Sequence, residues 1–336
     1  MKGSFWWAAQ RRCGWPGWLV WGGGVPYKRV DRKSREERDA NKLDTPEFNA
    51  KGFGSKSMST GTEEAPRRRD GLAAFLIAWR RDLFLVLTFF TRLPIGQLGE
   101  TPVTGGQETV PPPQVRLAQA ARAFPLAGLL VGLLGGVVYW IAVRIGLSNP
   151  LAALLAVGAT GAATGALHED GWADFADGLG ARGDRPRKLA AMKDSHIGSF
   201  GVLALIFGTA IKIAAVAALK SPERVMPALV AAHVLSRAVL PIVMRAIPLA
   251  TSTGLGAMAG RPTSTGVYSS LGLGLVIVFF AEFLPAAPVI FIAAVVAALL
   301  IGKIARRQFG GYTGDVLGAA EQVAEVAVLV NLVSLT

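Results

Sequence analysis

Residues Leu117–Ile145 read LAQAARAFPLAGLLVGLLGGVVYWIAVRI, and this stretch decides the class of fold. From Phe124 to Val143 it contains no charged side chain. An α-helix rises 1.5 Å per residue, so about 20 apolar residues cross the roughly 30 Å of hydrocarbon in a bilayer. Because backbone groups in lipid must be hydrogen-bonded within the protein, we expect a membrane-spanning helix here.

The same pattern recurs along the chain. Comparable apolar stretches are Leu151–Leu167, Phe200–Leu219, Val225–Leu249 and Val316–Leu335. Residues 271–301 are interrupted by a glutamate and two prolines, which predicts two short helices joined as a hairpin. Leu72–Phe90 is a weaker candidate with three charged residues at its centre, so it either spans, re-enters or lies in the interface. The sequence therefore predicts an all-α, polytopic membrane bundle of about seven transmembrane helices.

Composition supports a membrane protein over a soluble one. Hydrophobic residues make up 51% of the chain and charged residues 17%, whereas soluble domains carry about 25% charged residues. A net charge of +12 would suggest nucleic acid in a soluble chain. In a membrane protein it fits cytoplasmic loops beside the anionic inner leaflet, so we expect no nucleic-acid partner. The single cysteine, Cys13, excludes an intramolecular disulfide framework and a cysteine-rich metal site.

The density of charged residues falls sharply near residue 70. Of residues 1–70, 24 are charged, whereas the much longer segment 71–336 contains only 34 charged residues. A signal peptide is not expected, because Arg11, Arg12 and Gly14 interrupt the early apolar residues. Residues 1–70 are therefore predicted to be a disordered tail, an over-long gene start with Met58 as the initiator, or a functional tail. Residues 71–336 form the predicted integral membrane domain.

The basic residues predict the orientation. Threading the spans alternately places three basic residues on one side: Arg144, Lys220 and Arg224. The other side receives twelve: Arg116, Arg122, Arg182, Arg185, Arg187, Lys188, Lys193, Arg245, Arg261, Lys303, Arg306 and Arg307. The richer side is expected to be cytoplasmic, which predicts a multi-pass protein of the cell inner membrane.

Candidate chemistry concentrates in residues 168–178, HEDGWADFADG. Asp170, Asp174 and Asp177 follow i, i+4, i+7 spacing, which places them on one face of a helix. Adjacent carboxylates repel each other, and oxygen ligands suit Mg²⁺, Mn²⁺ or Ca²⁺. The alternative is a solvated acidic helix end that binds no ion. A basic segment follows at once, which favours a substrate that carries phosphate.

A second polar segment, GGYTGD at residues 310–315, precedes the last apolar stretch. Its glycines allow close approach to an anion. Asp315 is either a further metal ligand or the cap of the final helix. The predicted topology places Asp315 and the acidic segment on the same side, so the two can meet.

Charged side chains also occur inside predicted spans. Lys212 and Arg237 either face a cavity or partner or snorkel to the interface, and Glu321 and Glu325 lie one turn apart within the last span. His233 on an apolar face is interpreted as a packing residue. Arg92 either contacts a phosphate or anchors the chain at the interface.

Small residues suggest further local structure. Gly128, Gly132 and Gly136 at four-residue spacing, and Gly161 with Gly165, suggest close helix contacts. Residues 193–201 could cradle a phosphate at a helix start or simply cap that helix.

Five motifs occur in the order of a known family. They are Phe89–Pro94, Phe124–Gly128, His168–Gly178, Met192–Gly198 and Gly310–Ala319. Together they resemble cobalamin synthase, the adenosylcobinamide-GDP ribazoletransferase family, from about Leu72 to the C-terminus. Glu169 replaces an apolar residue of some members, and His196 stands where arginine is common.

The resemblance implies a membrane transferase late in vitamin B12 (cobalamin) biosynthesis, with Mg²⁺ as cofactor. It would join adenosylcobinamide-GDP to α-ribazole, or to α-ribazole 5′-phosphate, and release GMP. We expect a ribose 5′-hydroxyl to attack the diphosphate, with Asp177 or His168 taking its proton. The expected metal ligands are Asp170, Asp174, Asp177 and Asp315. The expected phosphate-binding residues are Arg182, Arg185, Arg187, Lys193 and Arg92.

Other functions use similar residues. A phospholipid head-group enzyme of the CDP-alcohol phosphotransferase type shares the aspartate chemistry, and a cation transporter could use Glu321 and Glu325 as a relay. Expected partners are the two substrates and the lipid bilayer. The resemblance leaves open a homo-oligomer or an association with other enzymes of the cobalamin pathway.

Overall fold

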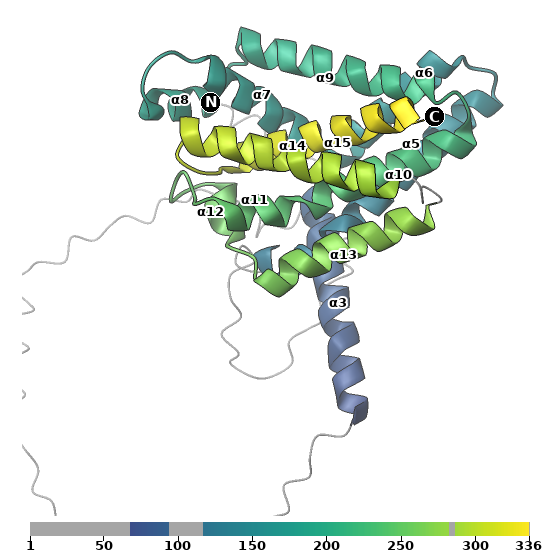
Figure 1. The fold of residues 1–336 in the computed structure, drawn as a ribbon, viewed down its shortest axis with the longest axis horizontal. Coiled ribbons are helices and arrows are strands. Elements are labelled where there is room, and N and C mark those ends of the chain that lie inside the picture. The colour runs from purple at the N-terminus through teal and green to yellow at the C-terminus, as the bar shows by residue number, and fades with distance from the viewer. Residues whose placement is uncertain (1–67, 94–116, 282–285, 336) are drawn as a thin grey trace, which may run out of the picture. The chain divides into compact units, whose positions relative to one another are not determined.

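The computed structural model describes residues 68–93, 117–281 and 286–335. In these ranges every regular element is a helix (Figure 1), which confirms the all-α prediction. The interpretation of the N-terminal region as a tail or an over-long gene start lies almost wholly outside the described residues.

The helices occur in a fixed order along the described parts of the chain. Their bounds are α3 (Arg68–Phe90), η3 (Ala120–Ala123), α5 (Phe124–Arg144), α6 (Asn149–Thr164), α7 (Leu167–Gly180), α8 (Arg185–Met192), α9 (Ser199–Ala218), α10 (Pro222–Ala238), α11 (Leu240–Ala246), α12 (Leu255–Ala259), α13 (Ser264–Phe280), α14 (Ala287–Gln308) and α15 (Gly314–Leu335).

Within the described ranges, 5 helices are long and apolar enough to cross a membrane: Leu117–Arg144, Ser199–Ala218, Pro222–Ala246, Ala287–Gln308 and Gly314–Leu335. The count becomes 6 if α6 and α7, bent by 90°, together form one span. The predicted number of about seven, plus or minus one, includes this upper count. Helix α13 is apolar but has only 17 residues, and it is not counted among the six.

The interrupted stretch 271–301 forms two helices, α13 and α14, as predicted. The second is not short, because α14 has 22 residues and continues to Gln308. Lys303, Arg306 and Arg307 therefore lie in the last turns of a helix and not in a loop.

The most deeply buried candidate span is Pro222–Ala246, which comprises α10 and α11; 83% of its apolar window is buried. It packs against the glycines of α5: a Cβ on Gly132 would lie 2.6 Å from Val230 Cα, and one on Gly128 would collide with the His233 carbonyl. The predicted close contact of these glycines is thus confirmed, with α10 as the partner. Peripheral α9 is only 28% buried and exposes Ile206 and Phe207, as a lipid-facing helix would.

The charged centre of α3 has a local explanation. Asp82 is buried; its Oδ2 accepts a hydrogen bond from Arg122 Nε at 2.8 Å and forms an ion pair with Arg122 Nη2, also at 2.8 Å. The Arg122 guanidinium also lies 4.5 Å from the ring centre of Trp79. This pair attaches α3 to the segment that begins α5.

A bend between α6 and α7 positions the acidic segment. Gly165 and Ala166 adopt left-handed φ values of 65° and 56°, and the helix axis turns by 90°. A Cβ on Gly165 would collide with the Arg92 side chain, whereas the nearest atom to a Cβ on Gly161 is a Glu169 oxygen at 3.9 Å. Gly161 and Gly165 therefore serve a turn and not the predicted helix–helix contact.

Candidate active site

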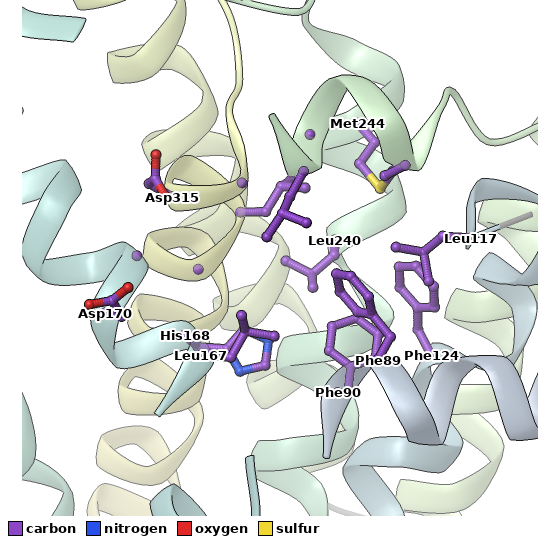
Figure 2. Close-up of a pocket in the computed structure, with 17 residues that line it drawn as sticks. Phe89, Phe90, Leu117, Phe124, Leu167, His168, Asp170, Leu240, Met244 and Asp315 are labelled. Carbon is purple, nitrogen blue, oxygen red and sulfur yellow. The ribbon is translucent and has the colours of Figure 1, made fainter. Parts of the chain in front are cut away.

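Helices α7 and α15 bring the two acidic segments together. A Cβ on Gly171 would lie 3.0 Å from Asp315 Cα, and a Cβ on Gly318 would lie 3.0 Å from the His168 carbonyl oxygen. Only glycine allows the two backbones to approach this closely. As a result Asp170 of α7 and Asp315 of α15 border one pocket (Figure 2).

The pocket has two chemically different sides. Figure 2 shows Asp170 and Asp315 on one side and Phe89, Phe90 and Phe124 on the other. Leucines and Met244 complete the apolar wall, and glycines of α7, α12 and α15 leave room near the carboxylates. None of the described lining residues is lysine or arginine.

His168 links the pocket to the protein interior. It is buried, lines the pocket and stacks on Phe90 with 5.5 Å between ring centres. Its Nδ1 lies 3.7 Å from Glu321 Oε2. Among the described residues, neither ring nitrogen has a hydrogen-bond partner.

Asp177 lies outside this pocket and holds the start of α9. Its Oδ2 accepts a hydrogen bond from the Gly198 N–H at 2.7 Å, and its Oδ1 accepts one from the Gly201 N–H at 2.8 Å. The helix start considered as a phosphate cradle is therefore capped by a carboxylate of α7. Asp174 is half-buried, one turn after Asp170, and does not line the pocket.

The predicted phosphate-binding residues lie outside the pocket lining. The four that follow α7 are exposed: Arg182, Arg185, Arg187 and Lys193. The Arg185 guanidinium packs on Gly310 and donates to the Ala250 carbonyl at 3.0 Å. Lys193 interacts electrostatically with Asp315. Arg92 packs on the α6–α7 bend and donates its backbone N–H to the Ala163 carbonyl at 2.7 Å.

The glycines of residues 310–315 serve chain packing. Tyr312 pairs with Leu249 as a parallel bridge, and a Cβ on Gly311 would collide with the Pro248 carbonyl. The cap of α15 is Thr313, whose Oγ1 accepts from the Val316 N–H at 3.3 Å. The alternative in which Asp315 caps this helix is therefore wrong. The Asp315 carboxylate borders the pocket, and its Oδ2 accepts a hydrogen bond from the Thr313 hydroxyl at 3.2 Å.

Charged residues inside the spans form a buried ion cluster. Its members are Glu169, Lys212, His233, Arg237, Glu321, Gln322 and Glu325. Arg237 Nη1 lies 2.6 Å from Glu321 Oε1, and Lys212 Nζ lies 3.4 Å from oxygens of both Glu325 and Glu169. Lys212 and Arg237 thus have partners and do not snorkel to the interface.

His233 belongs to the same cluster and is not a simple packing residue. Its Nδ1 lies 3.4 Å from Glu325 Oε2. By geometry, His233, Glu321 and Glu325 could hold a metal ion, because one ligand atom from each lies within 4.8 Å of the others. Both carboxylates, however, already face the cations Arg237 and Lys212, which would compete with a metal for them.

Sequence reasoning found these charges one at a time but missed the cluster. The sequence did contain a signal for the cluster. Two basic residues, Lys212 and Arg237, and two acidic residues, Glu321 and Glu325, lie in spans that are otherwise mostly apolar. Opposite charges that share a membrane interior usually pair with one another. The aromatic wall was also missed, because no pattern within α3 or α5 identifies which phenylalanines meet.

Comparison with known proteins identifies relatives over most of the chain. The CobS family, described as cobalamin-5-phosphate synthase, matches residues 82–333. An adenosylcobinamide-GDP ribazoletransferase of Bradyrhizobium diazoefficiens is 44% identical over 248 residues, covering 74% of this chain and 91% of the relative. Proteins with the same name from Mesorhizobium japonicum and Allorhizobium ampelinum are 40% and 36% identical, covering 74% and 76% of this chain and 91% and 98% of the relatives. No solved structure matches the chain.

Proposed function

The chain belongs to the cobalamin-5-phosphate synthase family, whose members are transferases of cobalamin biosynthesis, and we propose that its reaction occurs at the pocket bordered by Asp170 and Asp315. The protein acts as an adenosylcobinamide-GDP ribazoletransferase. The observation that carries this proposal is that two family motifs, far apart in the sequence, supply carboxylates to one pocket.

The reaction exchanges one phosphate ester bond for another. A hydroxyl oxygen of the ribose forms a bond to the phosphorus that is attached to cobinamide, and the bond from that phosphorus to the bridging oxygen of GMP breaks. GMP leaves with the electron pair, and the hydroxyl proton passes to a base. The 5′-hydroxyl expected above cannot be the general nucleophile, because it is already esterified in the 5′-phosphate acceptor. A ring hydroxyl must therefore attack.

The metal is proposed to be Mg²⁺, bound by Asp170 and Asp315 with Asp174 nearby. Two neighbouring carboxylates repel unless a cation lies between them, and Mg²⁺ prefers oxygen ligands. The buried ion cluster suits Mg²⁺ less well, because it would supply an imidazole and already contains its own cations. Bound Mg²⁺ would neutralise developing charge on the diphosphate.

The remaining roles follow from position. The exposed residues Arg182, Arg185, Arg187 and Lys193, with Arg92, are proposed to receive the nucleotide phosphates, and Lys193 interacts electrostatically with Asp315. His168 is the better candidate for the base because it lines the pocket. Asp177 is committed to two backbone N–H groups, so we assign it to holding α7 against α9.

We further propose that this end of the bundle faces the cytoplasm. Basic residues from three separate segments are joined there: Arg185 donates to the Ala250 carbonyl at 3.0 Å, and Lys188 donates to Gln308 at 2.5 Å. Arg261 donates to the Arg245 carbonyl at 2.6 Å. Such a basic concentration is retained on the cytoplasmic side of inner-membrane proteins. The transporter alternative is not favoured, because Glu321 and Glu325 are paired with cations.

The test is GMP release from adenosylcobinamide-GDP by the full-length protein in nanodiscs. We expect release that requires both α-ribazole and Mg²⁺. CDP-diacylglycerol with an alcohol should give no turnover. A properly inserted protein that releases CMP from CDP-diacylglycerol but no GMP from adenosylcobinamide-GDP would refute the proposed function.

A further inference from the structure

The pocket is too small for the larger substrate. Its cavity volume is about 110 Å³, below the range of about 300–1,000 Å³ that holds drug-sized ligands. A corrin ring with its side chains and a guanosine diphosphate is far larger than a drug, so only the smaller of the two substrates is a candidate for this pocket.

The lining supplies no cation of its own for an anion and favours a neutral aromatic group. Without the Mg²⁺ proposed at Asp170 and Asp315, a diphosphate would meet two carboxylates and, among the described lining residues, no lysine or arginine. Phe89, Phe90 and Phe124 instead offer ring faces and edges: Phe90 lies edge-on to both Phe89 and Phe124, with ring centres 5.1 and 5.0 Å apart. A flat aromatic ligand gains both apolar burial and ring contacts in such a site.

The opposite side suits hydroxyl groups. Ionised carboxylates accept hydrogen bonds and do not donate them, so Asp170 and Asp315 fit a ligand that donates from O–H. The required ligand therefore has an uncharged aromatic end and a hydroxyl-bearing end. Of the two proposed substrates, α-ribazole, a ribose attached to dimethylbenzimidazole, has this division.

We infer that the pocket is the acceptor subsite, with the benzimidazole against Phe89, Phe90 and Phe124 and the ribose hydroxyls toward Asp170 and Asp315. This inference rests on the proposed function and adds which substrate the pocket holds. The diphosphate of the donor then approaches from the side of Lys193 and meets the ribose at the carboxylates. The aromatic wall selects the base of the acceptor, and the two carboxylates select its sugar.

The test compares Phe89→Leu with Phe84→Leu. Both residues are half-buried in α3, but only Phe89 lines the pocket. Titration calorimetry with α-ribazole alone, on full-length protein in nanodiscs, should show about 3- to 10-fold weaker binding for Phe89→Leu and none of this loss for Phe84→Leu. In turnover assays, Phe89→Leu should raise the KM for α-ribazole and leave the KM for adenosylcobinamide-GDP within about twofold.

A second variant covers the case in which Phe89→Leu fails to fold. Leu255 is 52% exposed and also lines the pocket, so Leu255→Trp should obstruct it without disturbing the core. It should weaken α-ribazole binding as well. GMP should not displace α-ribazole from the wild-type protein.

Each failure has a distinct meaning. If the wild type releases GMP but both pocket variants bind α-ribazole normally, the inference is wrong and the proposed function stands. The inference is also wrong if the pocket variants raise only the KM for adenosylcobinamide-GDP. It is wrong as well if the affinity for α-ribazole depends on the acyl-chain length of the nanodisc lipid and is unchanged by Phe89→Leu. If α-ribazole binds and depends on Phe89 while no GMP is released, the acceptor subsite stands and the proposed transfer fails.

Discussion

At the scale of single residues, Asp170 and Asp177 share a helix but differ in surroundings. Asp170 is exposed at the edge of the pocket, on the same side as Asp315, and Asp177 is hydrogen-bonded to the start of α9. Two tests separate a role in the reaction from a role in the fold.

We expect Asp170→Asn to lower turnover by about 100-fold or more, because it removes one of two carboxylates proposed to bind the cation. Thermal unfolding should change little, since the side chain is exposed. Asp184→Asn, which alters an exposed carboxylate at the start of α8, is the matched control and should retain wild-type GMP release. Normal turnover by Asp170→Asn would remove Asp170 from the site.

We expect Asp177→Ala to destabilise the protein by about 1–2 kcal/mol, because two N–H groups at the start of α9 lose their acceptor. The midpoint of thermal unfolding in detergent measures this effect. Asp177→Asn keeps one carbonyl oxygen and should lose less stability while retaining substantial turnover. An Asp177→Asn protein with wild-type stability and no turnover would instead identify Asp177 as the base.

The sequence predicted correctly which residues share a helix. It did not predict which residues contact each other when they are far apart in the sequence. The helical spacing of Asp170, Asp174 and Asp177 follows from sequence alone, and α7 contains all three. That Asp177 caps α9 depends on Gly198 and Gly201, which lie 21 and 24 residues away. No spacing rule identifies such a partner, because the chain between them leaves α7, forms α8 and returns.

At the scale of elements, α5 and α10 pack through glycines whose replacement has a defined cost. We expect Gly132→Ala to destabilise the protein by about 1–3 kcal/mol, because the added methyl group would lie 2.6 Å from Val230 Cα and the helices must separate. Gly158→Ala in α6 has no atom within 4 Å of the new Cβ and should be neutral or slightly stabilising. Equal unfolding temperatures for the two variants would contradict this packing.

The glycine spacing predicted that α5 makes a close contact but not which helix it meets. Four-residue spacing defines a smooth helix face. Only the structure shows that this face meets α10, at Met226, Val230 and His233. The same signal in α6 was misleading, because Gly165 is needed for its left-handed φ of 65°. Glycine serves both close helix packing and left-handed turns, and the spacing of glycines in the sequence does not distinguish these two roles.

At the scale of the whole molecule, the buried ion cluster joins α7, α9, α10 and α15. We expect Arg237→Met to destabilise the protein by about 3–5 kcal/mol, because it leaves the Glu321 carboxylate buried without its cation. The double variant Arg237→Met/Glu321→Gln should recover much of that loss, since the introduced amide is uncharged and can still accept a hydrogen bond from Ser236. Thermal unfolding of both single variants and the double variant gives the coupling. Additive losses would show that the pair does not interact.

The orientation of the bundle is the last prediction at this scale. Helices α8 and α12 lie at one end of the bundle and the connection between α5 and α6 lies at the other (Figure 1). In a chain with Cys13→Ser, a membrane-impermeant maleimide should label Ser148→Cys in spheroplasts, because Ser148 precedes α6 at the sparsely charged end. Ser252→Cys, in the exposed loop before α12, should react only after permeabilisation. The reverse pattern would place the carboxylate pocket on the periplasmic side, away from a cytoplasmic nucleotide supply, and would contradict the proposed orientation of the active site.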